Sequence, residues 1–339
     1  MRLLEHADLS AGNTLALPCV ARYLARPESL EDVAFALASA RAEQCPVRVL
    51  GEGSNVVLAP HLEALVLQPA NRGIRCLEQT DDTVLVEVAA GENWDALVGH
   101  CVDKGWYGLE NLSLIPGSVG ASPFQNIGAY GVELADFLED LDAVSLQDGV
   151  THTFPRAQCG FAYRDSVFKS SQAGRWLIWR VRLRLSRRFA PQLGYGELQQ
   201  QFAALPTAQQ TAAGLRRLVT RIRQDKLPDP SVLPNAGSFF KNPVIPAAQH
   251  QALKERFPGL VSYAQPGGDW KLAAGWLIEQ AGFKGLRDGA LGMHARQALV
   301  LVNHGDASAE QVRQFAERVR QAVSDMFGVT LEQEPVLFD

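Results

Sequence analysis

Cysteine and histidine are scarce, and their spacing favours neither a disulfide framework nor a metal site. The 339 residues contain five cysteines, an odd number with no C-x-x-C pair. Such spacing argues against paired disulfides, a zinc site and a thioredoxin-like motif. The seven histidines are scattered without H-E-x-x-H spacing, so we expect no bound metal.

Excess positive charge and long apolar runs are absent as well. The formal net charge is −5, so we expect no general attraction to nucleic acid or to an anionic membrane. No apolar run approaches the ~18 residues of a membrane span. Glu5 and Asp8 interrupt the N-terminal segment where a signal peptide is apolar. We therefore expect a cytoplasmic protein. A content of 47% apolar and 20% charged residues fits a globular enzyme of two or three domains.

Two glycine-rich segments are the most informative part of what is present. Residues 51–55 read GEGSN and lead into the apolar VVL, and residues 115–131 read IPGSVGASPFQNIGAYG. Glycine lets a ligand approach the backbone closely, and successive turn N–H groups form concavities that hold phosphate oxygens. Neither segment has the G-x-G-x-x-G of a dinucleotide fold or the ending of a P-loop. Each alone is compatible with a tight turn, but two together indicate one long, phosphate-bearing ligand.

The first half of the chain alternates predicted strands and helices. Ser29 and Asp32 resemble a capping box at the start of a helix over 27–44. Its apolar face would contain Leu30, Val33, Ala34, Leu37 and Ala38. This order of elements is typical of an α/β arrangement. The other elements predicted here are strands at 47–50, 62–67 and 83–89 and a helix at 93–104.

The second half carries arginine-rich elements and a proline-rich loop. We interpret the arginines at 180, 182 and 184 as the solvated side of a half-buried strand. Those at 216, 217, 221 and 223 would mostly form the solvated face of a helix. Five prolines stiffen the loop at 226–246. The elements predicted here are strands at 141–146, 176–185, 298–302 and 331–339 and helices at 206–224, 270–281 and 308–327.

Seven short strings occur in an order that resembles the UDP-N-acetylenolpyruvoylglucosamine reductase (MurB) family. They are LGEGSNVVL, IPGSVGASPFQNIGAYGVEL, FAYRDSVFK, KLPDP, NAGSFFKNP, AAGWLIEQ and QALVL. The resemblance extends from about residue 12 to the C-terminus. GYGEL at 194–198, together with YRDSVFK, resembles the sub-type that has an extra substrate loop with a tyrosine.

The resemblance implies an α+β fold, with a two-lobed FAD-binding domain of the p-cresol methylhydroxylase or vanillyl-alcohol oxidase (PCMH/VAO) type and a C-terminal α+β substrate-binding domain. Residues 1–70 would form lobe 1, 71–205 lobe 2, and 206–328 the substrate-binding domain, with a strand at 329–339 returning near the active site. Some relatives in that superfamily attach the flavin to a histidine at the end of the first glycine loop. Asn55 stands there in this chain, so we expect non-covalent FAD. By the match, the FAD-binding residues would be Gly51, Gly53, Ser54, Asn55, Gly117, Ser118, Gly120, Ala121, Gln125, Asn126, Gly128 and Ala129.

The implied reaction is the NADPH-dependent reduction of UDP-N-acetylglucosamine enolpyruvate to UDP-N-acetylmuramate, a step of peptidoglycan precursor synthesis and hence of cell-wall biogenesis, cell shape and division. NADPH would be the co-substrate. Hydride addition to the terminal enolpyruvyl carbon leaves charge on the adjacent carbon and its carboxylate, which calls for a cation and a proton donor. By the match, Arg164 would bind the carboxylate and Ser238 would donate the proton. Glu334 would assist Arg164 in its protonated form.

Each catalytic assignment has a simpler interpretation. Arg164 could pair with its neighbour Asp165, Ser238 could be a turn residue, and Glu334 could be a solvated strand residue. The family usually ends L-E-P-E-V, whereas this chain has LEQEPV, in which a regular strand would place Glu332 and Glu334 on the same face. We keep Glu334 as the match. The residues expected to contact the substrate or the nicotinamide nucleotide are Tyr163, Tyr195, Arg223, Lys226, Asn242 and Gln297.

Two other functions remain open at this point. A flavin oxidase or hydroxy-acid dehydrogenase would share the fold, which alone does not decide function, and a non-catalytic flavin or nucleotide-sugar sensor would share the glycine loops. NAGSFFKNP and the terminal glutamate favour the reductase, because they serve proton delivery to an enol. We expect a monomer, since no helix shows an exposed apolar stripe.

Overall fold

The computed structural model describes residues 1–339, which divide into two compact units. The first unit contains residues 1–7, 21–52 and 63–223, and the second contains residues 8–20, 53–62 and 224–339. No helix is both long enough and apolar enough to cross a membrane. In the second half of the chain the first unit ends at Arg223 and the second resumes at Gln224.

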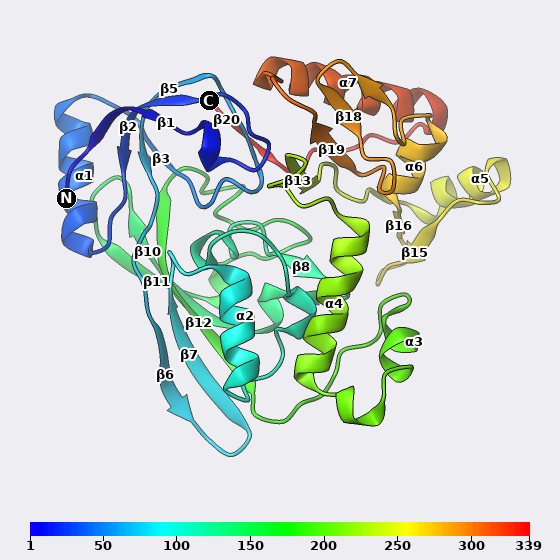
Figure 1. The fold of residues 1–339 in the computed structure, drawn as a ribbon, viewed down its shortest axis with the longest axis horizontal. Coiled ribbons are helices and arrows are strands. Elements are labelled where there is room, and N and C mark those ends of the chain that lie inside the picture. The colour runs from blue at the N-terminus through cyan, green and yellow to red at the C-terminus, as the bar shows by residue number, and fades with distance from the viewer. The chain divides into compact units, whose positions relative to one another are not determined.

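A four-stranded sheet and one helix begin the first unit (Figure 1). The strand order is β1-β2-β5-β3, and β3 runs parallel to β5. The capping box of Ser29 and Asp32 is formed at the start of α1, as predicted. Val33 and Leu37 of the predicted apolar face are buried, but Leu30, Ala34 and Ala38 are exposed; Ala36 and Ala40 complete the buried face instead. The elements are β1 (Leu4–Asp8), β2 (Val20–Ala25), α1 (Leu30–Ala42), β3 (Val47–Val49) and β5 (His61–Leu67).

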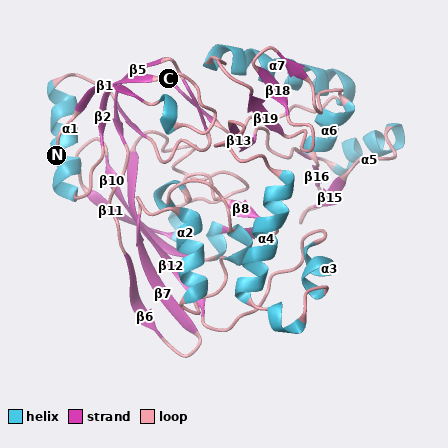
Figure 2. Cartoon of the chain, viewed as in Figure 1, coloured by secondary structure: helices cyan, strands magenta, loops and turns pink.

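An antiparallel five-stranded sheet forms the rest of the first unit's scaffold. Its order is β11-β10-β12-β7-β6, and α2 runs along it (Figure 2). Asn93 caps α2, whose Trp94 and Leu97 are buried in the same hydrophobic core as Val86 and Val181. The elements are β6 (Ile74–Gln79), β7 (Thr83–Ala89), α2 (Trp94–Asp103), β10 (Leu138–Ser145), β11 (Thr151–Pro155) and β12 (Trp176–Ser186).

The middle arginine of β12, Arg182, was predicted to face solvent but is largely enclosed by acidic side chains. Arg182 lies opposite Glu87 of β7 and Asp140 of β10. Its guanidinium forms ion pairs with Glu87 at 3.0 Å, Asp140 at 2.5 Å and Asp142 at 2.6 Å. Only 17% of the Arg182 side chain is exposed, whereas Arg184, two residues on, is 37% exposed.

Helices α3 (Leu198–Ala203) and α4 (Ala212–Lys226) complete the first unit, and the last turn of α4 enters the second. The predicted helix at 206–224 therefore begins six residues later. Leu215, Leu218 and Ile222 of α4 pack with residues of α3, as the periodicity indicated.

The second unit is built from short sheets and three helices. The sheet orders are β13-β19-β18-β17 and β14-β16-β15, and β20 pairs in parallel with β4. Helix α7 begins with the predicted capping box of Ser308 and Gln311 and buries Phe315 and Val319 in this unit's core. The elements are β4 (Val56–Leu58), β13 (Asn235–Ser238), β14 (Val244–Ile245), α5 (Ala247–Arg256), β15 (Ser262–Ala264), β16 (Trp270–Leu272), α6 (Ala274–Gln280), β17 (Arg287–Asp288), β18 (Leu291–Met293), β19 (Val300–Asn303), α7 (Ala309–Phe327) and β20 (Val336–Phe338).

Two predictions in this unit were wrong in detail. The helix predicted over 270–281 is split, because Trp270–Leu272 form the central strand β16 and only Ala274–Gln280 are helical. The final strand begins at Val336, so Glu332 and Glu334 precede it and do not share one face of a regular strand.

Candidate active site

Within the first unit, the start of the first glycine loop lies against the second loop. A Cβ added to Gly51 would lie 3.1 Å from Ser118 Oγ and 3.2 Å from Ala121 Cβ. The second loop is fixed by backbone hydrogen bonds, such as the 2.8 Å bond from Gly120 N to the carbonyl of Ala90. A Cβ on Gly120 would lie 2.6 Å from the Cβ of Ala90, so only glycine fits there without displacement.

Four backbone N–H groups of these loops have no hydrogen-bond partner in the protein. They are the N–H groups of Gly51, Glu52, Gly117 and Ser118. Clustered N–H groups of this kind bind phosphate oxygens. The donors and the absence of side chains at Gly51 and Gly120 fit the pyrophosphate of FAD, so these residues would hold that part of the cofactor.

The end of the first glycine loop belongs to the second unit, where it joins the C-terminal segment. Gly53 has φ +70° and packs so closely that a Cβ would lie 2.1 Å from the carbonyl oxygen of Gly12. The carbonyl of Asn55 accepts a hydrogen bond from Val336 N at 3.0 Å. The Asn55 side-chain amide donates to the carbonyl of Glu334 at 3.5 Å. The predicted flavin loop and the predicted catalytic glutamate are therefore neighbours within one unit.

Asn126 organises the far end of the second loop. Its side chain is fully buried; the amide nitrogen donates to Glu133 at 2.7 Å and to the carbonyl of Ala162 at 3.1 Å, and the amide oxygen accepts from Ala135 N. The Asn126 side chain thus holds the loop against the turn that carries Arg164.

Arg164 sits on a strained turn beside that loop. Its φ is +55°, in the left-handed region that is uncommon for a non-glycine residue. The guanidinium donates to the carbonyl of Gly128 and lies 5.2 Å from the ring centre of Tyr163. The carboxylate of Asp165 accepts a hydrogen bond from Ser166 N at 2.8 Å. This arrangement places the Arg164 cation at the end of the predicted flavin loop.

Tyr195 and Arg223 lie beside Tyr130, which the sequence analysis missed. The rings of Tyr130 and Tyr195 meet edge to face at 5.7 Å. Burial raises the pKa of Tyr130, and the nearby Arg223 acts in the opposite direction. Burial also lowers the pKa of Arg223, whose Nε is buried and has no hydrogen-bond partner. The prediction that Arg223 lies on the solvated face of its helix was therefore wrong. Tyr130 could have been recognised as a site residue from the sequence, because it directly follows Ala129 in the glycine-rich string.

In the second unit, Ser238 and Glu334 lie on hydrogen-bonded segments. Ser238 ends β13 opposite Val300 of β19, and the next residue, Phe239, accepts a hydrogen bond from Glu334 N at 2.9 Å. Gly237 turns the chain before Ser238 with φ +70°. The structure thus brings together two of the three predicted catalytic residues, which are about a hundred residues apart in the sequence.

Glu332 and Glu334 have different surroundings. The side chain of Glu332 is 72% exposed and forms an ion pair with Lys241. The backbone of Glu332 also accepts from Lys241 N at 2.8 Å. Glu334 is half-buried. Glu332 therefore has an ion-pair partner of its own, a lysine whose side chain is only 11% exposed.

The remaining predicted contacts of the second unit occupy three segments. Asn242 caps α6, since its side-chain oxygen accepts from Ala274 N at 2.9 Å. The side-chain oxygen of Gln297 faces Gly275, where an added Cβ would lie 3.1 Å away. Lys226 ends α4 and is exposed.

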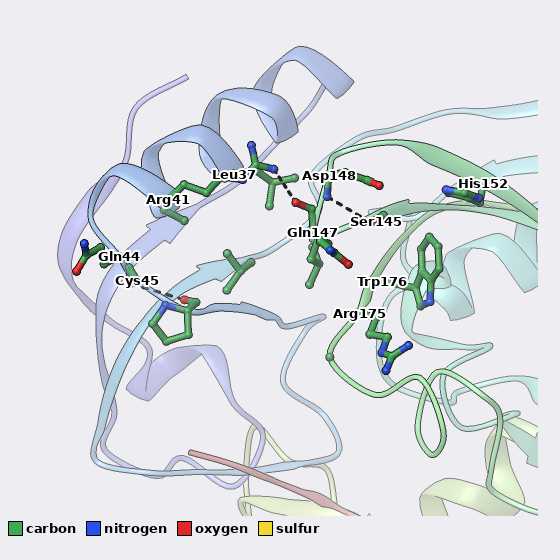
Figure 3. Close-up of a pocket in the computed structure, with 15 residues that line it drawn as sticks. Leu37, Arg41, Gln44, Cys45, Ser145, Gln147, Asp148, His152, Arg175 and Trp176 are labelled. Carbon is green, nitrogen blue, oxygen red and sulfur yellow. Dashed lines mark hydrogen bonds between the residues drawn. The ribbon is translucent and has the colours of Figure 1, made fainter.

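An open cavity of about 920 Å³ in the first unit lies elsewhere (Figure 3). Its walls come from the end of α1, the start of β3, the β10–β11 turn and the start of β12, with Arg41, His152 and Trp176 among its residues. None of the predicted site residues lines it. Arg41 donates to the carbonyl of Gln147 across this cavity.

Comparison with known proteins places both parts of the chain. Residues 21–154 match the model of an FAD binding domain, and residues 229–338 match that of the UDP-N-acetylenolpyruvoylglucosamine reductase C-terminal domain. The chain is 52% identical over 338 residues to UDP-N-acetylenolpyruvoylglucosamine reductase of Pseudomonas aeruginosa, covering 100% of this chain and 99% of that protein. It is also 52% identical over 331 residues to the Chromobacterium violaceum protein of the same name, covering 97% of each. The crystal structure of the Thermus caldophilus reductase (MurB) superposes with a TM-score of 0.68 at 26% identity, covering 100% of this chain and 98% of that one.

The FAD-binding domain and its paired glycine loops define a flavin-dependent oxidoreductase. Identity of 52% over the full length then shows that the chain belongs to the UDP-N-acetylenolpyruvoylglucosamine reductase (MurB) family. The predicted family, fold class, enzyme class and FAD cofactor are confirmed. The tyrosine-loop sub-type, the domain boundaries and the roles of single residues stay predictions.

Proposed function

We propose that this protein reduces the enolpyruvyl group of UDP-N-acetylglucosamine enolpyruvate to the lactyl ether of UDP-N-acetylmuramate, with NADPH as the hydride source. The observation that carries the proposal is the backbone hydrogen bond from Glu334 N to the carbonyl of Phe239, which brings the segments of Ser238 and Glu334 together in the second unit. Residues that bear a hydroxyl and a carboxyl group on adjoining segments suit proton delivery to an enol, which neither a simple oxidase nor a sensor requires.

FAD, when bound at the glycine loops, would supply the hydride-transfer chemistry between NADPH and the terminal carbon of the enolpyruvyl double bond. The chain's own residues must then bind the substrate, orient it and manage charge and protons.

Arg164 would bind the enolpyruvyl carboxylate. A guanidinium presents a planar fork of donors and stays charged, so it stabilises the negative charge that develops toward the carboxylate. Its carbonyl partner Gly128 and the aromatic ring of Tyr163 limit its freedom. Binding through a pre-oriented fork costs less entropy than binding through a mobile side chain.

Ser238 would protonate the carbon next to the carboxylate. Its hydroxyl is a weak acid, so its proton must be replaced through a relay from solvent. Phe239 and Phe240 after it are fully buried, and they fix the backbone at the end of β13. Glu334 would act as a protonated carboxyl group beside the substrate carboxylate, because two ionised carboxylates at contact distance repel each other.

The proposal is tested with the purified holoenzyme by anaerobic spectroscopy. NADPH should bleach the yellow absorbance, and the enolpyruvyl nucleotide should restore it with formation of UDP-N-acetylmuramate. Restoration by oxygen or by a hydroxy-acid product alone would favour the oxidase or dehydrogenase. Failure of NADPH to bleach the protein would favour a sensor.

We also propose that the enzyme is a cytoplasmic monomer. Both proposed substrates are soluble nucleotides of the cytoplasm, and the exposed large apolar side chains are scattered and do not form one stripe. Light scattering on the purified protein at working concentration measures the oligomeric state.

A further inference from the structure

The loop that carries Tyr195 has a single hydrogen-bonded anchor in its central part. Residues 187–197 join β12 to α3, and most of them are exposed. Among residues 189–194, only Gln192 hydrogen-bonds to another part of the protein. Its carbonyl accepts from the side-chain amide of Asn111 at 2.9 Å. Phe189 and Leu193 of this loop also make apolar contacts with the first unit.

The same amide group holds the end of the second glycine loop. Asn111 Nδ2 also donates to the carbonyl of Tyr130 at 3.0 Å. Asn111 is only 1% exposed, and Tyr130 has φ +51°, an unusual conformation for a tyrosine. Each of the two amide hydrogens therefore has its own carbonyl, one on the flavin loop and one on the tyrosine loop.

The two loops meet where their tyrosines touch. The Tyr195 ring packs edge to face on Tyr130 at 5.7 Å, and Tyr195 lies between Gly194 and Gly196, which leave the backbone flexible. A mobile loop must lose conformational entropy when a ligand orders it. An anchor that orders it in advance lowers that cost.

We propose that Asn111 is a positioning residue that fixes Tyr195 against Tyr130 and so prepares the tyrosine loop for the diphosphate of a nucleotide-sugar ligand. The inference rests on the proposed function, since that function makes Tyr195 a substrate contact. Asn111 itself is buried, and it would act through the two carbonyls that it holds.

The test uses the FAD-loaded full chain with Asn111→Ala and Asn111→Asp, the second of which keeps the size and removes the donors. Calorimetry measures the Kd for UDP-N-acetylglucosamine, and hydrogen exchange measures amides 189–195 without ligand. Loss of the two hydrogen bonds should raise the Kd roughly tenfold and speed exchange in this loop. The FAD content should stay that of the wild type.

A double-mutant cycle separates positioning from general stability. In a Tyr195→Ala background, Asn111→Ala should raise the Kd no further, because its effect passes through Tyr195. Asn303→Ala is the matched control: Asn303 is also 1% exposed and donates to the carbonyl of Leu15 at 2.8 Å in the second unit. It should lower the melting temperature without changing the Kd or the loop exchange.

Two results overturn the inference. One is loop exchange in Asn111→Asp equal to that of the wild type, and the other is full additivity of the Asn111 and Tyr195 effects on Kd. Failure of the proposed function looks different, because the wild type would then neither bind the nucleotide sugar nor reduce the enolpyruvyl substrate, while loop exchange would still report on Asn111.

Discussion

Ser238 shows how a weak acid is placed for proton transfer. Gly237 adopts φ +70° before it, and Asn235 fixes that turn by accepting a hydrogen bond from Gly237 N at 2.9 Å. Asn235 in turn donates to the carbonyls of Pro228 and Leu233 in the proline-rich loop. The stiff loop thus fixes the backbone that carries the hydroxyl.

Replacement of Ser238 by alanine should separate the two half-reactions. Bleaching by NADPH needs no enol proton, so its rate should stay near that of the wild type. Recovery of absorbance with the enolpyruvyl substrate should slow about 10²–10⁴-fold, the usual contribution of a positioned proton donor. Stopped-flow absorbance measures both phases. Equal slowing of the two phases would show that Ser238 supports the structure and does not deliver the proton.

The two carboxyl groups near the C-terminus should respond differently to amidation. Glu332 is 72% exposed and pairs with Lys241, whose side chain is only 11% exposed. A carboxylate that solvent surrounds gains little from such a pair. Glu334 is half-buried, and its backbone is bonded to the segment of Ser238. We therefore expect a large loss of substrate reduction for Glu334→Gln and a small one for Glu332→Gln, measured as kcat and KM with the enolpyruvyl nucleotide.

The Lys241 pair provides the control for that comparison. Lys241→Met should reproduce the small effect of Glu332→Gln, because both remove the same ion pair. A larger loss for Glu332→Gln than for Glu334→Gln would move the catalytic assignment by two residues along the LEQEPV segment.

At the scale of elements, the five-stranded sheet is held at its centre by charge. Arg182 of β12 pairs with acids on both neighbouring strands, and Glu87 and Asp142 are 6% and 8% exposed. Arg182→Ala leaves these carboxylates buried without their cation, so it should destabilise the protein by about 3 kcal/mol. Arg184→Ala on the same strand removes a more exposed pair with Glu139 and should cost at most about 1 kcal/mol. Urea unfolding at pH 7 measures both.

The effect of Arg182→Ala on stability should depend on pH, because Arg182 pairs with the carboxylate of Glu87. Burial opposes ionisation of Glu87, but hydrogen bonds from Arg75 and Arg182 outweigh it and hold the pKa of Glu87 below its ordinary value of 4.5. A carboxyl group with a lowered folded pKa stabilises the fold above pH 4.5, and that stabilisation is lost as the pH falls through the folded value. Arg182→Ala should therefore reduce the acid sensitivity of stability. Equal destabilisation by Arg182→Ala and Arg184→Ala would contradict the buried network.

Local signals in the sequence predicted the helix starts, and long-range pairing accounts for most errors. The capping boxes of Ser29 and Ser308 depend on residues three positions apart, so they are visible in the sequence. The surroundings of Arg182 depend on strand register, which brings Glu87 and Asp140 beside it from distant positions. Trp270–Leu272 follow a helical pattern but become the central strand of a sheet because β14 and β15 pair with them.

In the candidate site too, features encoded in short strings could be predicted, and features that depend on distant residues could not. Motif strings indicated both glycine loops, and the inference that one ligand binds both agrees with Gly51 lying against Ser118 and Ala121. Asn111 could not be recognised, because a buried asparagine that donates to two distant carbonyls has no sequence signature. Arg223 was misread for a related reason, since Tyr130, which interacts with it, comes from a distant part of the chain.

At the scale of the whole molecule, the chain passes repeatedly between its two units. Residues 8–20 and 53–62 belong to the second unit although they interrupt the first in sequence. The last strand, β20, pairs in parallel with β4 directly after the first glycine loop. Neither unit is one continuous stretch of chain, so functional tests require the full-length protein.

The full-length protein should hold FAD tightly but without a covalent bond. The residue at the end of the first glycine loop is Asn55, whose amide donates to the Glu334 carbonyl and is not a nucleophile that forms a stable bond to a flavin. Acid or heat precipitation should release all of the yellow colour into the supernatant. Ligand binding stabilises the folded state by mass action, so FAD at a hundred times its Kd should add about 2.7 kcal/mol to the stability of the stripped protein. Differential scanning calorimetry of stripped and reloaded protein measures that gain, with riboflavin, which lacks the pyrophosphate, as the control. Colour that stays in the pellet, or equal stabilisation by riboflavin, would contradict a cofactor held through its phosphates by the glycine loops.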